Sequence, residues 1–317
     1  MTHGLMSAAA LAWLVWVVCL LVFRRRPELR VGSLREFLFP VAALLIGLAW
    51  FFTTRDLPGA WFLSLFLRAG VIIGALLAVV WLLSLIKRDS GIMDVAYPLC
   101  AALPVLVLVA RRGSWSAHEI VLTTMVSLWA VRMSLYIGVR NVGHAEDGRY
   151  AAWRRRFKGN WWWWSFFQVF LTQGVMVWLW SLGLLAAVAV GAPPLGWQHA
   201  LALALFAFGF YFQVVGDMQL KRFKQERTER SQVLDTGLWA LTRHPNYFGE
   251  AMIWWSFGAL ALLHPWGWLT LLCPLYVTWF MSVGSATPMQ ERYLAKTKPD
   301  YAGYMRRVPA FFPWTRP

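Results

Sequence analysis

The densest run of polar side chains able to do chemistry lies in residues 235–250, where a basic segment meets a long apolar one. Pro245 interrupts the pattern there, and proline suits the first turn of a helix because its missing N–H would be unpaired in that turn anyway. A helix that begins at Pro245 places Asn246, Glu250 and Trp254 on one face, four residues apart. An amide, a carboxylate and an indole on one helix face predict a hydrogen-bonding site for a polar ligand. The alternative is a solvated helix start at the lipid headgroups.

A second polar face precedes this one along the chain. A helix through it would align four residues at i, i+4, i+8 and i+11, namely Gln213, Asp217, Lys221 and Lys224. The two hydrogen-bonding groups suit a nicotinamide or a ribose, and the two cations suit phosphates. The alternative is an amphipathic helix that emerges into water with weak surface pairs. The sequence has no G-x-G-x-x-G and no P-loop, so any dinucleotide site here differs from the Rossmann and Walker cradles.

Charged residues also occur inside the apolar runs. Asp94 begins an otherwise uncharged run, with Tyr97 one turn further on, and it is either a functional acid or a helix-start acid stabilised by the helix dipole. Arg132 lies deep within another run, and the i, i+4, i+8 spacing puts it on one face with Tyr136 and Arg140. Because Arg132 is too deep to reach the headgroups easily, we expect it to be buried against a partner such as Asp94. That pair is either a structural ion pair or a contact to a ligand.

The composition is that of a membrane protein. Hydrophobic residues make up 59% of the 317 residues and charged residues only 14%, whereas soluble domains carry about a quarter charged residues. Apolar runs of about 20 residues recur without the alternation of barrel strands, so the predicted fold class is all-α, a polytopic transmembrane helical bundle. We expect about nine spans, at 7–23, 37–54, 62–86, 92–110, 116–139, 162–190, 197–217, 247–263 and 267–285.

The net charge of +15 follows from membrane topology and does not indicate a nucleic-acid partner. Most of the 30 Lys and Arg residues fall in alternate loops, so the positive-inside rule places the N-terminus outside and the C-terminus in the cytoplasm. The basic loops can also serve an anionic cofactor or anionic membrane lipids. The first apolar run lacks a cleavage signal and is interpreted as an uncleaved span. We expect an integral protein of a bacterial inner membrane or its equivalent.

Neither the cysteines nor the histidines predict a metal site. The three cysteines all fall within apolar runs, far apart in the sequence, and no pair of the six histidines has zinc-ligand spacing. The cysteines are interpreted as small core residues. His244 is the histidine best placed for a role in a site.

Three stretches of the sequence resemble a known family. The run Thr236–Glu250, TGLWALTRHPNYFGE, resembles the hallmark of a membrane family related to the steroid 5α-reductases (the DUF1295 type). The superfamily also includes sterol reductases and isoprenylcysteine carboxyl methyltransferases. Residues 146–154 resemble that family's cytoplasmic loop, and residues 291–309 resemble the superfamily's C-terminal segment. The resemblance implies a seven-helix reductase-like membrane domain at 62–317, preceded by two additional helices within 1–61.

The activity that the resemblance implies is an NADPH-dependent reduction of a carbon–carbon double bond, of the enone type, in a sterol-like or other lipid that enters from the bilayer. Hydride reaches the β-carbon while a proton donor polarises the carbonyl group. Asp94 and Tyr97 are the candidates for that donor, with Arg132 close behind, and the family carries an Asp at a place similar to Asp94. The chain departs from the steroid reductases at span five, where Trp129 occupies the place expected for a tyrosine.

The resemblance also implies a cofactor site on the cytoplasmic side. The residues expected to hold the nicotinamide and ribose are Asn246, Glu250, Asp217, Gln213 and Tyr293, with His244 and Trp254 beside them. Those expected to meet the phosphates are Lys221, Lys224 and Arg243, with a contribution from Arg149.

Two other functions fit the same residues. An S-adenosylmethionine-dependent membrane methyltransferase shares the Arg-His-Pro tripeptide and the C-terminal segment, although the Asn-Tyr-Phe-Gly-Glu continuation and the Glu-Asp-Gly-Arg-Tyr loop favour a reductase. A non-catalytic lipid-binding protein or transporter is the other alternative, because acids within spans also mark ion pathways. Against it, the polar groups gather at one membrane face and no internal repeat is present. The identity of the lipid substrate and the oligomeric state stay open.

Overall fold

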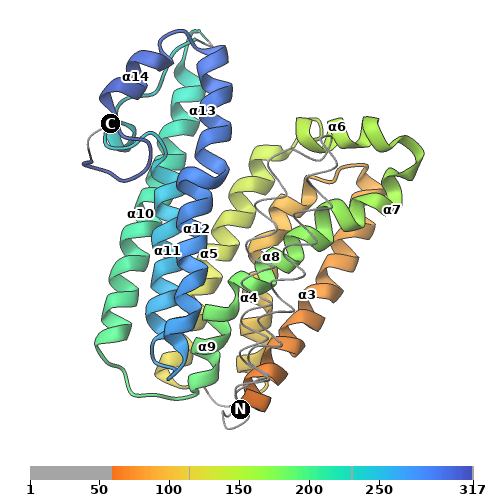
Figure 1. Cartoon of the computed structure of the whole chain (residues 1–317), viewed down its shortest axis with the longest axis vertical. Coiled ribbons are helices and arrows are strands. Elements are labelled where there is room, and N and C mark those ends of the chain that lie inside the picture. Colours follow the sequence, from red (N-terminus) through yellow and green to blue (C-terminus); the bar gives the residue numbers. More distant parts are fainter. Residues whose placement is uncertain (1–58, 114, 230, 316–317) are drawn as a thin grey trace, which may run out of the picture. The chain divides into compact units, whose positions relative to one another are not determined.

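The chain is helical throughout the residues that its structure describes. The computed structural model describes residues 59–113, 115–229 and 231–315, and within these it contains helices and turns but no strand (Figure 1). The all-α prediction is therefore confirmed for this part. The spans predicted at 7–23 and 37–54 lie outside the described residues.

The described residues form two compact units, one that ends at Pro194 and one that begins at Leu195. The helices of the first unit are α3 (Gly59–Lys87), α4 (Ile92–Ala110), α5 (Ala117–Asn141), α6 (Gly148–Phe157), α7 (Trp161–Ser165), α8 (Thr172–Trp180) and α9 (Leu182–Val190). The helices of the second unit are α10 (Trp197–Glu226), α11 (Pro245–Ala261), α12 (Leu272–Trp279), α13 (Ala286–Thr297) and α14 (Tyr301–Arg307). A short helical turn, η4 (Gly237–Ala240), precedes α11.

Five helical stretches in the described residues are long and apolar enough to cross a membrane, at Phe62–Lys87, Ile92–Ala110, Ala117–Asn141, Trp197–Glu226 and Gly267–Thr297. They coincide with five of the predicted spans, so several helices of membrane-spanning length and composition are confirmed, whereas the total of nine and the orientation stay predictions. The span predicted at 162–190 is broken, because Gly148–Trp180 and Leu182–Val190 meet at a bend of 41°. The span predicted at 247–263 corresponds to α11, whose 17 residues rise only about 25 Å, less than the hydrocarbon thickness.

Two polar segments beyond the predicted spans are helical. The segment after residue 217 continues α10 to Glu226, as the helical spacing of Asp217, Lys221 and Lys224 predicted. The loop after Arg140 contains α6, a polar helix that hydrophobicity could not detect.

In the first unit, α4 packs against α3, α5 and α8. Its two internal prolines, Pro98 and Pro104, are buried together with the small residues Cys100, Ala101 and Ala102. Small side chains let neighbouring helices approach closely, which is the usual basis of helix association in membranes. The face of α4 that carries these prolines and small residues therefore lies in the interior of the unit. Asp94 stands in the first turn of the same helix.

In the second unit, α10 and α11 run side by side and touch backbone to backbone (Figure 1). The contact forms where Gly209 of α10 meets Gly249 of α11. A Cβ atom on Gly249 would lie 2.5 Å from the Gly209 carbonyl oxygen and 2.6 Å from the backbone nitrogen of Gln213. This glycine crossing brings Gln213 within reach of Glu250, the residue that follows Gly249.

We expect Gly249→Ala to destabilise the protein by about 1–3 kcal/mol, the usual range for overpacking a close contact. The two backbone atoms in the way cannot rotate aside, so α10 and α11 must separate. The measurement is the midpoint of thermal unfolding in detergent. Gly74→Ala is the control, because a Cβ atom on Gly74 meets nothing within 4 Å. Equal midpoints for the two variants would contradict the tight crossing.

Candidate functional site

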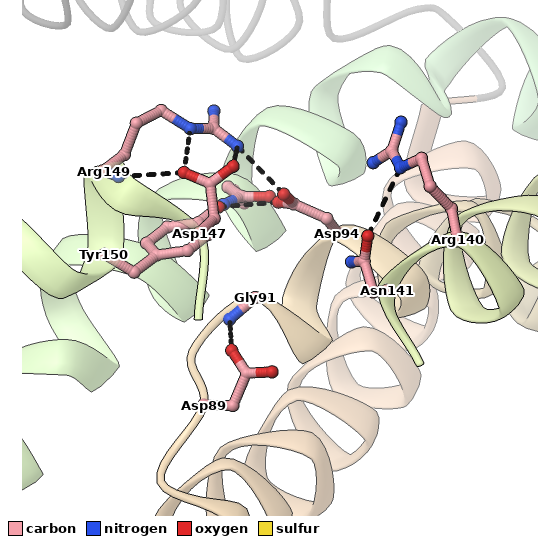
Figure 2. A network of polar contacts seen from close by, with 9 residues as sticks. Asp89, Gly91, Asp94, Arg140, Asn141, Asp147, Arg149 and Tyr150 are labelled. Atoms are coloured by element: carbon pink, nitrogen blue, oxygen red, sulfur yellow. Dashed lines mark hydrogen bonds and ion pairs between the residues drawn. The ribbon is translucent and has the colours of Figure 1, made fainter. Parts of the chain in front are cut away.

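Asp94 is held by two consecutive side chains of α6, those of Arg149 and Tyr150 (Figure 2). Its Oδ1 accepts a hydrogen bond of 2.6 Å from the Tyr150 hydroxyl, and its Oδ2 lies 3.0 Å from Nη2 of Arg149. Gln173 on α8 donates to the Tyr150 oxygen at 3.0 Å. Tyr150 is buried, whereas the Asp94 side chain keeps 22% of its surface exposed. A carboxylate and a phenol thus share a short hydrogen bond at the edge of the unit.

Arg149 connects this pair to a second carboxylate. Its Nε lies 2.9 Å from Oδ1 of Asp147, and Asp147 also accepts a hydrogen bond from the Arg149 backbone N–H, which caps α6. The guanidinium carbon of Arg149 stands 5.2 Å from the centre of the Tyr150 ring. Figure 2 shows Arg149 reaching over Asp147 towards Asp94. Its N–H groups therefore serve two carboxylates, an environment that differs from the predicted phosphate contact.

Glu146 fastens the same loop to the start of α4. It accepts hydrogen bonds of 2.8 Å from both Nε and Nη2 of Arg154, and one of 2.8 Å from the backbone N–H of Ser90. Burial raises the pKa of the Glu146 carboxyl, but these hydrogen bonds and the Arg154 charge outweigh it and hold the pKa below its usual range. Both ends of the segment Glu146–Tyr150 therefore bind the start of α4. Glu146 binds the backbone N–H of Ser90, and Tyr150 binds Asp94.

The other two candidate donors, Tyr97 and Arg132, make contacts with aromatic rings. The Tyr97 ring lies edge-on to Trp129, with ring centres 6.3 Å apart. Arg132 stands over the ring of Tyr136 at 4.9 Å, and Arg140 lies 5.9 Å from the same ring centre. The shared face of these three residues agrees with their spacing. The pairing expected between Arg132 and Asp94 is replaced by that of Arg149 with Asp94.

In the second unit, Glu250 is the centre of a buried hydrogen-bond network. Its Oε1 accepts a hydrogen bond of 2.9 Å from Nε1 of Trp254, one turn further along α11, and its Oε2 accepts one from Nε2 of Gln213 on α10. All three side chains are buried, with Glu250 only 3% exposed. Burying a carboxylate in a mostly apolar bundle is costly unless both oxygens are hydrogen-bonded. The network is therefore an ordered polar site.

Asn246 and Asp217 form a second pair on the same two helices. Nδ2 of Asn246 donates to Oδ1 of Asp217 at 3.0 Å. Asp217 is buried, whereas Asn246 is only partly buried and stands at the edge of the pair. Further along α10, Lys221 and Lys224 are exposed. Five residues predicted for the cofactor site (Gln213, Asp217, Asn246, Glu250 and Trp254) thus come together at the α10–α11 crossing, which we call the α10–α11 polar face.

Three other predicted site residues lie outside these two networks. Tyr293 on α13 is 63% exposed. Arg243 is buried and lies 2.6 Å from Oε1 of Glu291, and His244 is buried with its Nε2 3.4 Å from the same oxygen. Burial lowers the pKa of the His244 imidazole, and the neighbouring Glu291 carboxylate only partly offsets this. The His244 ring stacks on Tyr247 at 5.2 Å.

A cavity of about 460 Å³ opens at the end of α10. Its walls include Phe223, Arg227, Asp235, Tyr304 and Arg307, none of which was a predicted site residue. Across residues 59–113, 115–229 and 231–315, no group of three or more His, Cys, Asp or Glu side chains is arranged to hold a metal ion.

Comparison with known proteins places this chain in a family. A family model described as a protein of unknown function (DUF1295) matches residues 80–308, which is most of the chain. The chain belongs to this family. Both networks, around Asp94 and around Glu250, lie within the matched residues.

The chain is also similar to individual proteins. Steroid 5-alpha-reductase DET2 of Arabidopsis thaliana is 28% identical over a stretch that covers 36% of this chain and 42% of that protein. The protein of the same name from Gossypium hirsutum is 30% identical, covering 33% and 39%. The uncharacterized protein C594.04c of Schizosaccharomyces pombe is 25% identical, covering 74% and 76%. The matched stretch spans less than half the length of either steroid reductase. No solved structure gives a significant match.

Tyr150 and Gln173 are the site residues that sequence reasoning missed. Tyr150 belongs to a stretch singled out for its resemblance to the family, but its partner Asp94 lies 56 residues earlier in the sequence. The available signal was the composition of that loop. Glu146, Asp147 and Arg149 are charged residues that need partners, and a tyrosine beside them at a helix start can supply a hydroxyl to a partly buried acid.

Proposed function

We propose that this protein is a membrane-embedded, NADPH-dependent reductase of a carbon–carbon double bond conjugated to a carbonyl group in a lipid. Membership of the family and the similarity to two proteins named steroid 5-alpha-reductase support the reaction class. The several apolar helices support a substrate that enters from the bilayer. The observation that carries the proposal is the α10–α11 polar face, a set of buried hydrogen-bonding groups inside helices that are otherwise apolar.

The residues of this face fit the polar parts of a nicotinamide cofactor. Asn246, Gln213 and Glu250 offer amide donors and carboxylate acceptors, the groups that a carboxamide and ribose hydroxyls require. Lys221 and Lys224 follow on the same helix and supply cations for phosphates. When bound, NADPH would supply the hydride. The chain's own residues orient the cofactor and, since the face is buried, keep water from it.

In the first unit, the Asp94–Tyr150 pair is the candidate for polarising the carbonyl group. The proton of the Tyr150 hydroxyl lies in a 2.6 Å hydrogen bond to Asp94, and Gln173 and Arg149 fix the positions of both partners. A proton held at this pair stabilises negative charge that develops on a substrate oxygen. Asp94 keeps the role predicted from the sequence, while Tyr150 takes the place that Tyr97 was expected to fill.

The distribution of basic residues supports a cytoplasmic cofactor face. The α10–α11 polar face is followed by the basic segment that ends α10, and the positive-inside rule assigns such segments to the cytoplasm. NADPH is a cytoplasmic cofactor with several phosphate charges, which basic loops attract.

Thermal unfolding of the detergent-purified protein with added ligands tests the cofactor directly. Because a ligand that binds only the folded state stabilises it by mass action, NADPH at a hundred times its Kd should add about 2.7 kcal/mol. We expect a clear upward shift of the unfolding temperature with NADPH and none with S-adenosylmethionine. A shift with S-adenosylmethionine alone would replace the proposal with methyl transfer. No shift with either ligand would favour a non-catalytic protein.

A further inference from the structure

The loop that leads into α11 is the attachment point of the C-terminal segment 301–311, which we call the strap. The backbone N–H of Arg243 donates to the Pro309 carbonyl oxygen at 2.9 Å. Its Nη1 donates to the carbonyl oxygens of Met305, at 3.0 Å, and Val308. The Thr242 hydroxyl donates to the Phe311 carbonyl oxygen at 2.8 Å. The same hydroxyl lies 3.3 Å from the Ala310 carbonyl oxygen, so two consecutive residues contact five carbonyl groups of the strap.

The charge of Arg243 is neutralised inside this attachment. Its Nε lies 2.6 Å from Glu291 on α13, and only 8% of its surface is exposed. A guanidinium group has five N–H donors in a fixed fork, which suits it to bind one carboxylate and two carbonyl groups at the same time. A phosphate ligand would have to compete with Glu291 and with both carbonyl groups. Arg243 therefore has the contacts of a structural residue that joins the loop before α11 to the strap and to α13.

Apolar contacts extend the attachment along both ends of the strap. Tyr301, Tyr304 and Val308 form a buried cluster with neighbours that include Val233 and Leu294. The Tyr304 hydroxyl donates to the Trp239 carbonyl oxygen in η4 at 2.6 Å. At the other end, Phe311 packs in a cluster with Phe248 of α11 and Phe212 of α10. Phe248 and Phe212 are close neighbours of Glu250 and Gln213 in sequence.

The first turn of α11 receives no side-chain hydrogen bond from its N-cap residue, and within the turn the Asn246 Oδ1 accepts one of 3.1 Å from the Tyr247 N–H. His244 is the N-cap residue and makes no side-chain hydrogen bond to the first turn. Helix starts usually satisfy their unpaired N–H groups through a Ser, Thr, Asp or Asn side chain, and losing such a cap costs about 1 kcal/mol. Here the strap holds the residues immediately before Pro245, and Asn246 lies in the turn that follows.

We propose that Arg243 is a positioning residue for the α10–α11 polar face, which acts by fastening the strap to the start of α11 and so fixing Asn246 and Glu250 for ligand binding. This inference rests on the proposed function, which makes that face the cofactor site. It replaces the phosphate contact expected for Arg243 from the sequence. The strap is accordingly part of the cofactor site, although none of its residues is assigned to touch the cofactor.

The test compares Arg243→Gln, Arg243→Lys and Lys221→Gln by NADPH affinity and by hydrogen exchange of the backbone amides of residues 246–250. We expect Arg243→Gln to bind NADPH at least tenfold more weakly, with an unchanged dependence of Kd on salt and with faster exchange at 246–250. Arg243→Lys should fail to restore affinity, because one ammonium group cannot reach Glu291 and two carbonyl groups together. Lys221→Gln should weaken NADPH binding and make Kd less dependent on salt, because it removes a cation that meets the phosphates. Hydrogen exchange at residues 246–250 should stay unchanged.

Restored affinity in Arg243→Lys, or a smaller salt dependence in Arg243→Gln without faster exchange, would overturn the proposal in favour of a phosphate ligand. If Arg243→Gln does not fold, Thr242→Val removes the hydroxyl that contacts the Ala310 and Phe311 carbonyl groups and accepts from the His244 N–H, and it should show the same local increase in exchange. Unchanged exchange in that variant would also overturn the proposal. A wild-type protein that does not bind NADPH would refute the proposed function, while the exchange data would still decide whether the strap holds the first turn of α11.

Discussion

Glu250→Gln should bind NADPH roughly ten- to a hundredfold more weakly than the wild-type protein while keeping its fold. Hydrogen bonds to a charged group contribute about 1.5–3 kcal/mol, and each 1.4 kcal/mol is about a factor of ten in Kd. The fold survives because the Gln213 amide can turn and present its oxygen to the new amide, so the contact between α10 and α11 is kept. What changes is the pattern of donors and acceptors that the polar face offers to a ligand.

The measurement is NADPH titration of the purified variant, with the thermal midpoint without ligand as the check on folding. Glu226→Gln is the matched control, because Glu226 ends α10, the helix packed against that of Glu250, and is exposed in a pair with Arg222. Wild-type affinity in Glu250→Gln would remove Glu250 from the site. If the unfolding temperature of Glu250→Gln without ligand falls far below that of the wild type, the Glu250 network serves folding instead.

Asp94→Asn should lose turnover by a factor of about 10² to 10⁴, the usual contribution of a positioned acid or base. NADPH binding should be unchanged. The amide keeps an oxygen for the Tyr150 hydroxyl but removes the negative charge that faces Arg149, so the proton at the pair is no longer held as in the wild type. Tyr150→Phe should lose turnover to a similar extent, since it removes the hydroxyl that Asp94 and Gln173 both contact.

The assay is NADPH-dependent reduction of a panel of enone lipids by the protein in lipid nanodiscs. Asp89→Asn provides the control, because Asp89 lies in the loop just before α4 and binds the Gly91 backbone N–H rather than the Asp94–Tyr150 pair. Full turnover in Asp94→Asn would reject Asp94 as an essential acid. Loss in Asp94→Asn with full turnover in Tyr150→Phe would assign the role to the carboxyl group without the phenol.

The features that the sequence predicted well are those set by neighbours along one helix. Pro245 marked the observed start of α11, and the four-residue spacing of Glu250 and Trp254 became a hydrogen bond of 2.9 Å. The extension of α10 was implied in the same way by the spacing of its polar residues. Such signals can be read from a sequence because residues three or four apart are neighbours on any helix.

The features that could not be predicted are set by contacts between distant segments. The pairing of Gln213 with Glu250 requires the helix crossing at Gly209 and Gly249. Nothing in the sequence indicates that these two glycines are in contact. Arg243 was expected to meet the cofactor phosphates, although its partners are carbonyl groups about 60 residues later in the chain. Backbone carbonyl groups carry no residue signature, so no motif could indicate them.

Hydride transfer from NADPH to a lipid is tested most directly by a double-label experiment. The purified protein in nanodiscs would be incubated with a lipid extract, NADPH deuterated at C4 and S-adenosylmethionine with a labelled methyl group. Mass spectrometry of the lipids would then show which label is transferred. We predict one deuterium atom in a lipid that has lost a double bond, and its absence in Asp94→Asn. A labelled methyl group without deuterium, or no transferred label at all, would contradict the assignment.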